Sequence, residues 1–354
     1  MSRTVHEAFS FTSLERAWVD VLENDSEDGV VSPGVQRFQD DLEANLAALS
    51  GDLGNDTYVP RRLTSVSIPG RKKSRELHIP HARDRVVARA ILDATTPVID
   101  PFLGSGAYAY RPGLGVRDAV QEVVALRAEG MTWVLRTDIR DCFPTLPKET
   151  ALRRFGILMA NDDLTHVVGL LLDRTFRSAT GGFRTLTGVP QGCPLSPLLA
   201  NLVLADLDRS LQRHGFPVVR YGDDLVVAAR TASDLQVAAT LAASVMKGLG
   251  MALNTDKTTM TSFDEGFAFL GEDFGPRYPP LLDQHRIEEP RQRVLYVARQ
   301  GSRVRTSAGR VIVESKDKSS VLDVPSSQVG RIVCFGSVGI SAGVRTWLLS
   351  KDIG

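Results

Sequence analysis

Two adjacent carboxylates, Asp223 and Asp224, follow Tyr221-Gly222 between two apolar runs rich in β-branched residues. This composition predicts two strands within residues 218–229, joined by a tight turn in which Gly222 supplies backbone freedom. Because side chains alternate along a strand, one carboxylate can face a site while its neighbour points partly away, and cations relieve their crowding. The pair therefore indicates a metal site, with an ordinary charged hairpin turn as the alternative.

A third carboxylate, Asp138, ends another apolar run that begins at Trp133. Two divalent ions about 3.5 to 4 Å apart, bridged by shared carboxylates, are a common device for in-line phosphoryl transfer. One ion activates the attacking hydroxyl and the other stabilises the leaving pyrophosphate. Mg²⁺ suits such a set of oxygen ligands. The aspartates therefore predict phosphoryl transfer if their strands bring them together.

The segment between these acidic runs, residues 187–201, is expected to form a rigid turn that leads into a helix. Pro197 suits the first helical turn, and Ser196 is expected to be the N-cap. Leucines recur beyond it at helical spacing, which predicts a broad apolar face. These leucines are Leu198, Leu202, Leu204, Leu207 and Leu211.

Together these segments resemble the palm of reverse transcriptases. They share an aspartate strand, a Pro-Gln-Gly turn with Ser-Pro opening a helix, and a Tyr-x-Asp-Asp hairpin, in that order. The resemblance covers about residues 12 to 275 and points to the group II intron and bacterial branch. Further matching segments are residues 75–80, Asp84-Arg85, residues 108–113, Asn254 with Lys257, and residues 269–271.

The resemblance implies a metal site of defined composition. It makes Asp138, Asp223 and Asp224 the ligands, with the backbone carbonyl of Ile139 as an additional oxygen. The expected cofactor is Mg²⁺, as two ions, with Mn²⁺ as a substitute. Asp138, Asp223 and Asp224 are accordingly the expected catalytic residues.

The resemblance also implies a nucleotide pocket. Gln191 would line it, and Phe143 would pack under the sugar and exclude a ribose 2′-hydroxyl, although Phe143 could instead be a core aromatic. Lys73 and Arg75 would reach the incoming triphosphate. Lys257 matches a lysine that protonates the departing pyrophosphate, with a plain surface lysine as the alternative.

Composition sets broader limits. The 354 residues hold 42 Lys plus Arg and 42 Asp plus Glu, so the overall charge carries no nucleic-acid signal. Three cysteines without paired spacing fit a reducing compartment and no zinc site. No apolar stretch approaches a membrane span and the start lacks a secretory segment, so a soluble, cytoplasmic protein without membrane contact is expected.

Positive charge is nevertheless concentrated ahead of the catalytic region. Such a cluster suits phosphate binding, with a solvated basic surface as the alternative. The residues are Arg61, Arg62, Arg71, Lys72, Lys73, Arg75, Arg83, Arg85 and Arg89.

The expected fold class is α+β, with the fingers and palm of a right-hand polymerase followed by a small all-β module. Helices are predicted at residues 12–23, 33–50, 84–93, 116–129, 162–175 and 234–249. The predicted domains are an N-terminal extension with fingers (1–115), a palm with the catalytic core (116–275), a linker (276–292) and a partial integrase-like β domain (293–354).

Short strands with turn signals between them predict that last domain, followed by a helix at 342–349. The pattern resembles the amino-terminal β domain of the CRISPR adaptation integrase, which some bacteria fuse behind a reverse transcriptase. The chain stops before the integrase catalytic domain would begin, and no helical thumb follows the palm. The domain is therefore expected to serve assembly, including a homodimer through residues 293–354.

The leading hypothesis is an RNA-directed DNA polymerase that makes cDNA for spacer acquisition, and so for antiviral defence. Its expected partners are an RNA or DNA template with a primer, deoxynucleotide triphosphates, and subunits of the CRISPR integrase complex. The alternatives are an antiphage or intron-type reverse transcriptase and a non-catalytic scaffold for the integrase. The intact aspartates favour an enzyme.

Overall fold

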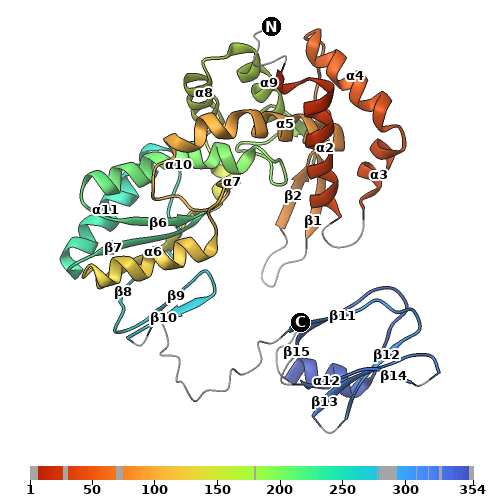
Figure 1. The fold of residues 1–354 in the computed structure, drawn as a ribbon. Coiled ribbons are helices and arrows are strands. Elements are labelled where there is room, and N and C mark those ends of the chain that lie inside the picture. Colours follow the sequence, from red (N-terminus) through yellow and green to blue (C-terminus); the bar gives the residue numbers. More distant parts are fainter. Residues whose placement is uncertain are drawn as a thin grey trace. The chain divides into compact units, whose positions relative to one another are not determined.

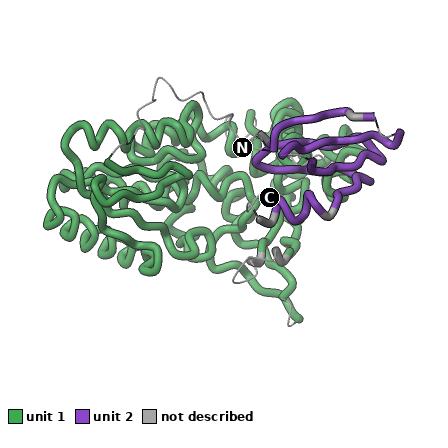
Figure 2. Tube along the Cα trace, turned by 90° about the horizontal axis from the view of Figure 1, so that it is seen from below, with its two compact units in different colours: residues 1–279 green, residues 280–354 purple. Residues whose placement is uncertain are grey.

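The computed structural model describes residues 7–26, 31–68, 75–178, 181–276, 278, 293–307, 309–317, 319–326 and 329–350. The chain divides into two compact units, residues 1–279 and residues 280–354 (Figure 2). Every helix in the described ranges is too short or too polar to cross a bilayer. The α+β class expected from the sequence is confirmed.

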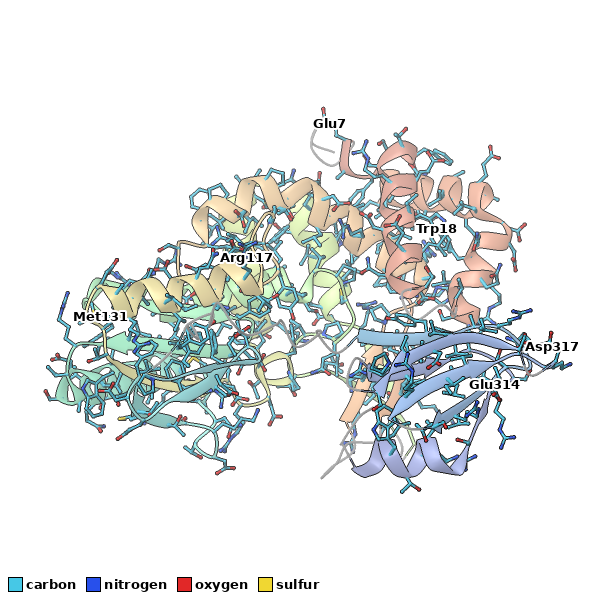
Figure 3. All side chains as sticks on the ribbon, turned by 60° about the horizontal axis from the view of Figure 1, so that its bottom comes forward. Glu7, Trp18, Arg117, Met131, Glu314 and Asp317 are labelled. Atoms are coloured by element: carbon cyan, nitrogen blue, oxygen red, sulfur yellow. The ribbon has the colours of Figure 1, made fainter. Side chains whose placement is uncertain are left out.

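The chain begins with helices α2 (Phe11–Asp25), α3 (Pro33–Asp40) and α4 (Leu42–Gly54), which pack around α5 (Ala82–Ile99). Trp18 on α2 (Figure 3) meets the ring of Phe38 on α3 at 5.0 Å between centroids. The sequence predicts one helix over 33–50, and this is wrong. Asp41 leaves helical geometry, with φ −127° and ψ 46°, and the bend lets both Phe38 and Leu46 enter the core.

Helix α5 is longer than the sequence predicts, because it continues past residue 93 to Ile99 and includes Pro97 in its last turn. Tertiary packing supports it along its length, and even Asp84 is fully buried. The Asp84 carboxylate accepts hydrogen bonds from the Tyr58 hydroxyl (2.8 Å) and the Arg174 guanidinium (3.5 Å). Asp84 is thus paired across the fold.

Two small hairpins and two helices complete this end of the first unit. Strands β1 (Thr64–Ile68) and β2 (Arg75–Ile79) pair antiparallel, as do β4 (Thr175–Arg177) and β5 (Phe183–Thr185). Helices α8 (Lys148–Met159) and α9 (Asp162–Leu172) pack against each other and against α5.

The central sheet has the order β6-β7-β3-β8, and all its pairings are antiparallel. Its strands are β6 (Val218–Tyr221), β7 (Asp224–Ala229), β3 (Trp133–Asp138) and β8 (Thr259–Ser262). Helix α6 (Val116–Ala128) covers one face, and α10 (Ser196–Arg213) and α11 (Ala232–Gly248) cover the other (Figure 1). The predicted hairpin and the predicted helices over these segments are confirmed to within a few residues.

Side chains of the sheet alternate between two cores. Leu135 and Val227 pack with α10 and α11, whereas Val134 and Val226 pack with α6. Burial on both faces explains why these strands are almost uninterrupted apolar runs in the sequence. The three aspartates lie at the strand ends or in the turn that joins two of the strands.

The first unit ends with a hairpin of β9 (Phe267–Phe269) and β10 (Glu272–Phe274). Arg127 of α6 then donates hydrogen bonds to the carbonyls of Gly275 (3.0 Å), Pro276 (2.9 Å) and Tyr278 (2.7 Å). The linker predicted for 276–292 otherwise lies outside the described residues. The described residues between α11 and α12 contain strands and no α-helix, so a thumb-like helix is absent from those described residues.

The second unit is the predicted all-β module. Strands β11 (Arg293–Val297) and β15 (Val329–Cys334) form a parallel pair. A four-stranded sheet has the order β14-β13-β12-β16, built from β12 (Arg303–Ser307), β13 (Arg310–Glu314), β14 (Ser320–Pro325) and β16 (Gly339–Ile340). Helix α12 (Ala342–Ser350) packs on β12 over a core that includes Val304 and Val344.

The described acidic residues of the second unit lie apart from one another, at a strand end, in a turn and on a strand. Glu314, at the end of β13, accepts a hydrogen bond from the Arg305 guanidinium at 2.7 Å. Asp317 lies in the turn that follows (Figure 3). Asp323 pairs with Arg310 at 2.7 Å. The described acids of this unit therefore take local structural partners.

Candidate active site

The turn between β6 and β7 holds the first two carboxylates. Tyr221 pairs with Asp224 across the hairpin, so the turn itself is Gly222-Asp223. Gly222 has φ +68°, a left-handed conformation that glycine adopts without steric cost and that a tight hairpin requires. Asp223 is exposed at the tip, and Asp224 is half-buried as the first residue of β7.

Asp138 lies directly beside this turn. It ends β3 and is the register partner of Asp224 on β7. The next residue, Ile139, donates its N–H to the Asp223 carbonyl at 3.0 Å, which fixes the turn against the end of β3. The structure thus brings Asp138, Ile139, Asp223 and Asp224 together at one edge of the sheet.

Charge at this edge is crowded. The Asp138 side chain is buried, 6% exposed, and one of its oxygens accepts a hydrogen bond from the Lys257 ammonium. Its other oxygen, Oδ1, is buried without a hydrogen-bond partner. Burial raises the pKa of Asp224, the charges of Asp223 and Asp138 raise it further, and Arg136 opposes the rise. The neighbouring carboxylates therefore make Asp224 harder to ionise in the absence of a cation.

The donor set fits a divalent metal ion, although the carboxylates do not form a finished cage. Within the described ranges, no group of three or more His, Cys, Asp or Glu side chains is arranged so that it could hold a metal ion as it stands. A hard divalent cation would nevertheless satisfy the unpartnered oxygen of Asp138 and neutralise the crowding around Asp224. Asp138 must release Lys257 for both of its oxygens to take part.

A pocket of about 490 Å³ opens next to the hairpin, and its lining includes Phe143, Gln191 and Tyr110. The loop that carries Gln191 is held against the segment of Phe143. Val189 donates its N–H to the Phe143 carbonyl at 2.9 Å, and a β-carbon on Gly188 would lie 2.0 Å from that oxygen. Only glycine permits this approach, so the loop and Phe143 keep a fixed spacing.

Ser196 is not the N-cap that the sequence predicts. Helix α10 begins at Ser196 itself, with Leu195 at the N-cap position. The Ser196 hydroxyl donates to the carbonyl of Pro190 at 2.7 Å. The hydroxyl therefore links the Pro-Gln-Gly turn to the start of the helix. It does so as a hydrogen-bond donor, whereas the side chain of an N-cap residue accepts a hydrogen bond from a backbone N–H.

The basic cluster expected to bind phosphate is largely neutralised where it is described. Arg83 pairs with Asp52, Arg85 with Asp25, and Arg89 with both Asp20 and Asp93. The pairs with Asp20, Asp25 and Asp52 join α5 to the N-terminal helices, whereas Arg89 and Asp93 both lie on α5. Arg71, Lys72 and Lys73 lie outside the described residues. Arg75 begins β2, but its side chain is not described.

A buried arginine that the sequence analysis missed stands behind the catalytic turn. Arg220 is 1% exposed and donates to both oxygens of Asp208, at 2.7 to 3.1 Å. Its Nη1 donates to Asn201 Oδ1 (2.8 Å) and to the Gly222 carbonyl (3.0 Å). Asn201 in turn donates to the Ala109 carbonyl at 3.0 Å. One guanidinium therefore connects helix α10 to the turn that carries Asp223.

The two cysteines near the site are packing residues. Cys142 and Cys193 are both buried. Burial, with the charge of Asp223, raises the pKa of the Cys142 thiol to about 12, which keeps it protonated. A buried, protonated thiol of this kind is a poor nucleophile.

Comparison with known proteins agrees with this geometry. The family described as reverse transcriptase (RNA-dependent DNA polymerase) matches residues 66–274, a range that contains the hairpin, β3 and the Pro-Gln-Gly loop. The chain belongs to the reverse transcriptase family. Members of this family generally use divalent metals, in keeping with the donor set. A second family, CRISPR associated protein Cas1, matches residues 295–354, so a Cas1-like region follows the reverse transcriptase.

Curated relatives include a retron reverse transcriptase and a group II intron-encoded protein. Protein YkfC of Escherichia coli (strain K12) is 29% identical over 70% of this chain and 76% of its own length. Retron Mx65 reverse transcriptase of Myxococcus xanthus is 28% identical over 63% of this chain and 55% of its own. The group II intron-encoded protein LtrA of Lactococcus lactis subsp. cremoris is 24% identical over 47% of this chain, which spans 28% of LtrA. The chain thus spans well under two thirds of the last two proteins.

The fold of part of this chain recurs in a solved structure. Telomerase from Candida albicans superposes on 61% of this chain and 44% of its own with a TM-score of 0.51 at 12% identity, which speaks to the fold alone. A chain of a Cas6-RT-Cas1–Cas2 complex matches 98% of this chain and 38% of its own, at a TM-score of 0.44 and 18% identity. A TM-score this low carries no conclusion about function.

Substitutions at Arg220 and Asp208 should separate two effects of this network, on the stability of the fold and on the position of the catalytic turn. Arg220→Met leaves the Asp208 carboxylate buried and unpaired, and should lower the free energy of unfolding by about 3 to 5 kcal/mol. The double variant Arg220→Met/Asp208→Leu removes both charges and should recover most of that stability. It still leaves the Gly222 carbonyl without its donor, so nucleotide incorporation should stay well below wild type.

Urea unfolding and steady-state primer extension on the three proteins test this prediction. A double variant that is stable and has the wild-type kcat would show that Arg220 serves the fold alone.

Proposed function

We propose that this chain copies RNA into DNA for the acquisition of spacers by a CRISPR integrase. The observation that supports polymerase activity is the pairing of Asp138 with Asp224 on neighbouring strands, beside Asp223. One oxygen of Asp138 is also left without a hydrogen-bond partner. The Cas1-like region at residues 295–354 supports the adaptation part, because it links a polymerase and integrase-like sequence in one chain. Other subunits of the integrase complex would be its partners.

In this proposal, two Mg²⁺ ions, or Mn²⁺ in their place, would bind to the carboxylates of Asp138, Asp223 and Asp224 and to the carbonyl of Ile139. Such ions, when bound, supply activation of the primer 3′-hydroxyl and charge neutralisation for the leaving pyrophosphate. The protein contributes position, because the hairpin and β3 present the carboxylates on rigid strands.

Lys257 has two successive partners in this proposal. Its side chain is 56% exposed and pairs with Asp138 in this structure, so it can leave that carboxylate without unfolding anything. Once released, the ammonium would give a proton to the departing pyrophosphate. Lys73 and Arg75 would hold the triphosphate from the hairpin of β1 and β2.

Phe143 and Gln191 would form the nucleotide pocket. Phe143 is half-buried and lines the pocket with Gln191, so one side of its ring remains available to a ligand. The close fit of Gly188 and Val189 on the Phe143 carbonyl holds the backbone that carries the ring. A ring on a fixed backbone would suit the exclusion of a 2′-hydroxyl and therefore the choice of deoxynucleotides.

Primer extension by the purified chain, on RNA and DNA templates with Mg²⁺ or Mn²⁺, tests the proposal. We expect incorporation in wild type and none above background in Asp223→Ala or Asp138→Ala. Both variants should melt at or above the wild-type temperature, because removal of one crowded carboxylate relieves repulsion when no metal is bound.

Asp40→Ala, which removes an exposed acid on α3, is the matched control and should extend primers like wild type. Extension by Asp223→Ala near the wild-type rate, with unchanged melting, would contradict the metal assignment. A wild-type chain that extends no primer under any of these conditions would favour the non-catalytic scaffold.

A second prediction concerns the sugar. Phe143→Val should raise the use of ribonucleotides relative to deoxyribonucleotides, because the smaller side chain leaves room for the 2′-hydroxyl. Single-nucleotide kcat/KM values for matched ribo- and deoxyribonucleotides measure the ratio. Phe216→Val is the control, since Phe216 is also half-buried and packs on the same core but does not line the pocket. If Phe143→Val discriminates as wild type does, the ring is only a core aromatic.

The second unit is proposed to supply an assembly surface, including a homodimer through residues 293–354. Its described acids are taken up in local pairs or lie apart, which argues against metal chemistry there. Sedimentation equilibrium of the full chain beside a chain that ends at Pro290 should give a dimer for the first and a monomer for the second. A shorter chain that remains dimeric, or a monomeric full chain, would exclude this role.

A further inference from the structure

Tyr110 has an unusual conformation next to the catalytic turn. Its φ is +60°, in the left-handed region that bulky L-residues rarely occupy. Its side chain is 60% exposed, so burial of the ring provides little compensation. A large aromatic residue that is both strained and exposed points to a role in binding, because such strain persists only where surrounding structure enforces it.

The surrounding structure does enforce it from both sides. The carbonyl of the preceding residue, Ala109, accepts a hydrogen bond from the buried amide of Asn201 at 3.0 Å. The following residue, Arg111, is clamped by Asp100 through Nε (2.8 Å) and Nη2 (3.1 Å) and donates from Nη1 to the Ala107 carbonyl (2.9 Å). The backbone at Tyr110 is therefore set by its neighbours, and the ring is presented outward.

The ring lies against the catalytic turn. A β-carbon on Gly222 would be 3.6 Å from Tyr110 Cε2, in ordinary van der Waals contact. Tyr110 and Asp223 also line a small cavity with Phe143. Burial raises the pKa of Tyr110, and the charge of Asp223 raises it further, so the phenol is neutral and adds no negative charge to this edge.

Tyr110 also lines two larger hollows. One is the pocket of about 490 Å³ that holds Phe143 and Gln191. The other, of about 810 Å³, is lined largely by apolar and proline side chains, among them Pro97, Pro112 and Leu114. Its described arginines, Arg89 and Arg111, are already paired with carboxylates. This surface therefore suits a flat, uncharged group better than a phosphate.

We propose that Tyr110 is an aromatic platform on which a nucleobase stacks at the reacting end of the primer–template. This inference rests on the proposed polymerase function and adds a residue to its binding site. Every base has an aromatic face, so stacking on Tyr110 supports binding without choosing a sequence. The base belongs to the primer terminus, the templating position or the incoming nucleotide, which share the same chemistry.

The test uses the full chain and 2-aminopurine, a base whose fluorescence is quenched by stacking. The probe is placed in turn at the primer 3′ end, at the templating position, and in the triphosphate. Quenching should occur at one or more positions in wild type and in Tyr110→Phe, and it should be lost in Tyr110→Ala and Tyr110→Gly. Loss of the ring should weaken binding of that component by roughly 5- to 100-fold.

Tyr110→Gly separates stacking from structure, because glycine accepts φ +60° without strain. Its melting temperature should equal or exceed that of wild type although quenching is lost. Ala160→Gly is the matched control, since Ala160 also has a left-handed φ of +46° but is an exposed residue that ends α8. It should gain similar stability and keep wild-type quenching and binding.

The outcomes are distinct. Unchanged quenching and affinity in both Tyr110→Ala and Tyr110→Gly would overturn the platform, as would a Tyr110→Gly variant that loses binding only because it is less stable. Wild-type primer extension in the same preparation tests the polymerase proposal separately. A chain that extends primers but shows no Tyr110-dependent quenching loses only the platform.

Discussion

The position of the catalytic turn depends on one charge that is hidden from water. Arg220 lies in the middle of the core between β6 and α10, and its desolvation is offset only by full pairing with Asp208, Asn201 and the Gly222 carbonyl. A buried charge of this kind adds little net stability, but removal of one partner is costly. The arrangement therefore tolerates few alternatives. Helix α10, β6 and the turn must come together in one geometry or leave a charge unpaired.

The hydrogen bonds of Arg220 also extend to the segment of Tyr110, the residue with the left-handed backbone. Asn201 accepts from Arg220 through its carbonyl oxygen and donates to Ala109 through its amide nitrogen. Arg220 also exchanges backbone hydrogen bonds with Gly106 and Tyr108. The segment that presents Tyr110 and the turn that carries Asp223 are thus fixed to a common centre. A substitution at Asn201 would therefore disturb both the segment of Tyr110 and the turn of Asp223. A substitution at Tyr110 or at Asp223 need not disturb the other residue.

Much of this site could be predicted from the sequence, because its signals are local. The hairpin at 218–229 and the strand ending at Asp138 follow from apolar runs, a glycine in a two-residue turn and alternation along strands. Arg220 gave a visible signal, a charge inside an apolar strand. Its partner Asp208 lies on a helix, and no local rule connects the two. The segment 108–113 resembles reverse transcriptases, but the left-handed backbone of Tyr110 could not be predicted, since an aromatic residue gives no local signal for it.

The errors have the same origin. The bend at Asp41 and the extension of α5 beyond residue 93 are decided by what each helix packs against, which local propensity does not contain. Three arginines of the basic cluster, Arg83, Arg85 and Arg89, pair with aspartates of the N-terminal helices, and phosphate binding by the cluster stays a prediction. Residues distant in the sequence supplied those acids.

Arg127 has a mechanical consequence. It holds the carbonyls of Gly275, Pro276 and Tyr278, so the chain leaves the first unit from a point anchored on α6. A force applied through the second unit would act first on the hydrogen bonds of Arg127. The force would then be transmitted to helix α6, which covers one face of the sheet, and not to strand β8, which pairs with β3. Motion of a tethered partner is thereby kept away from the carboxylates at the strand ends.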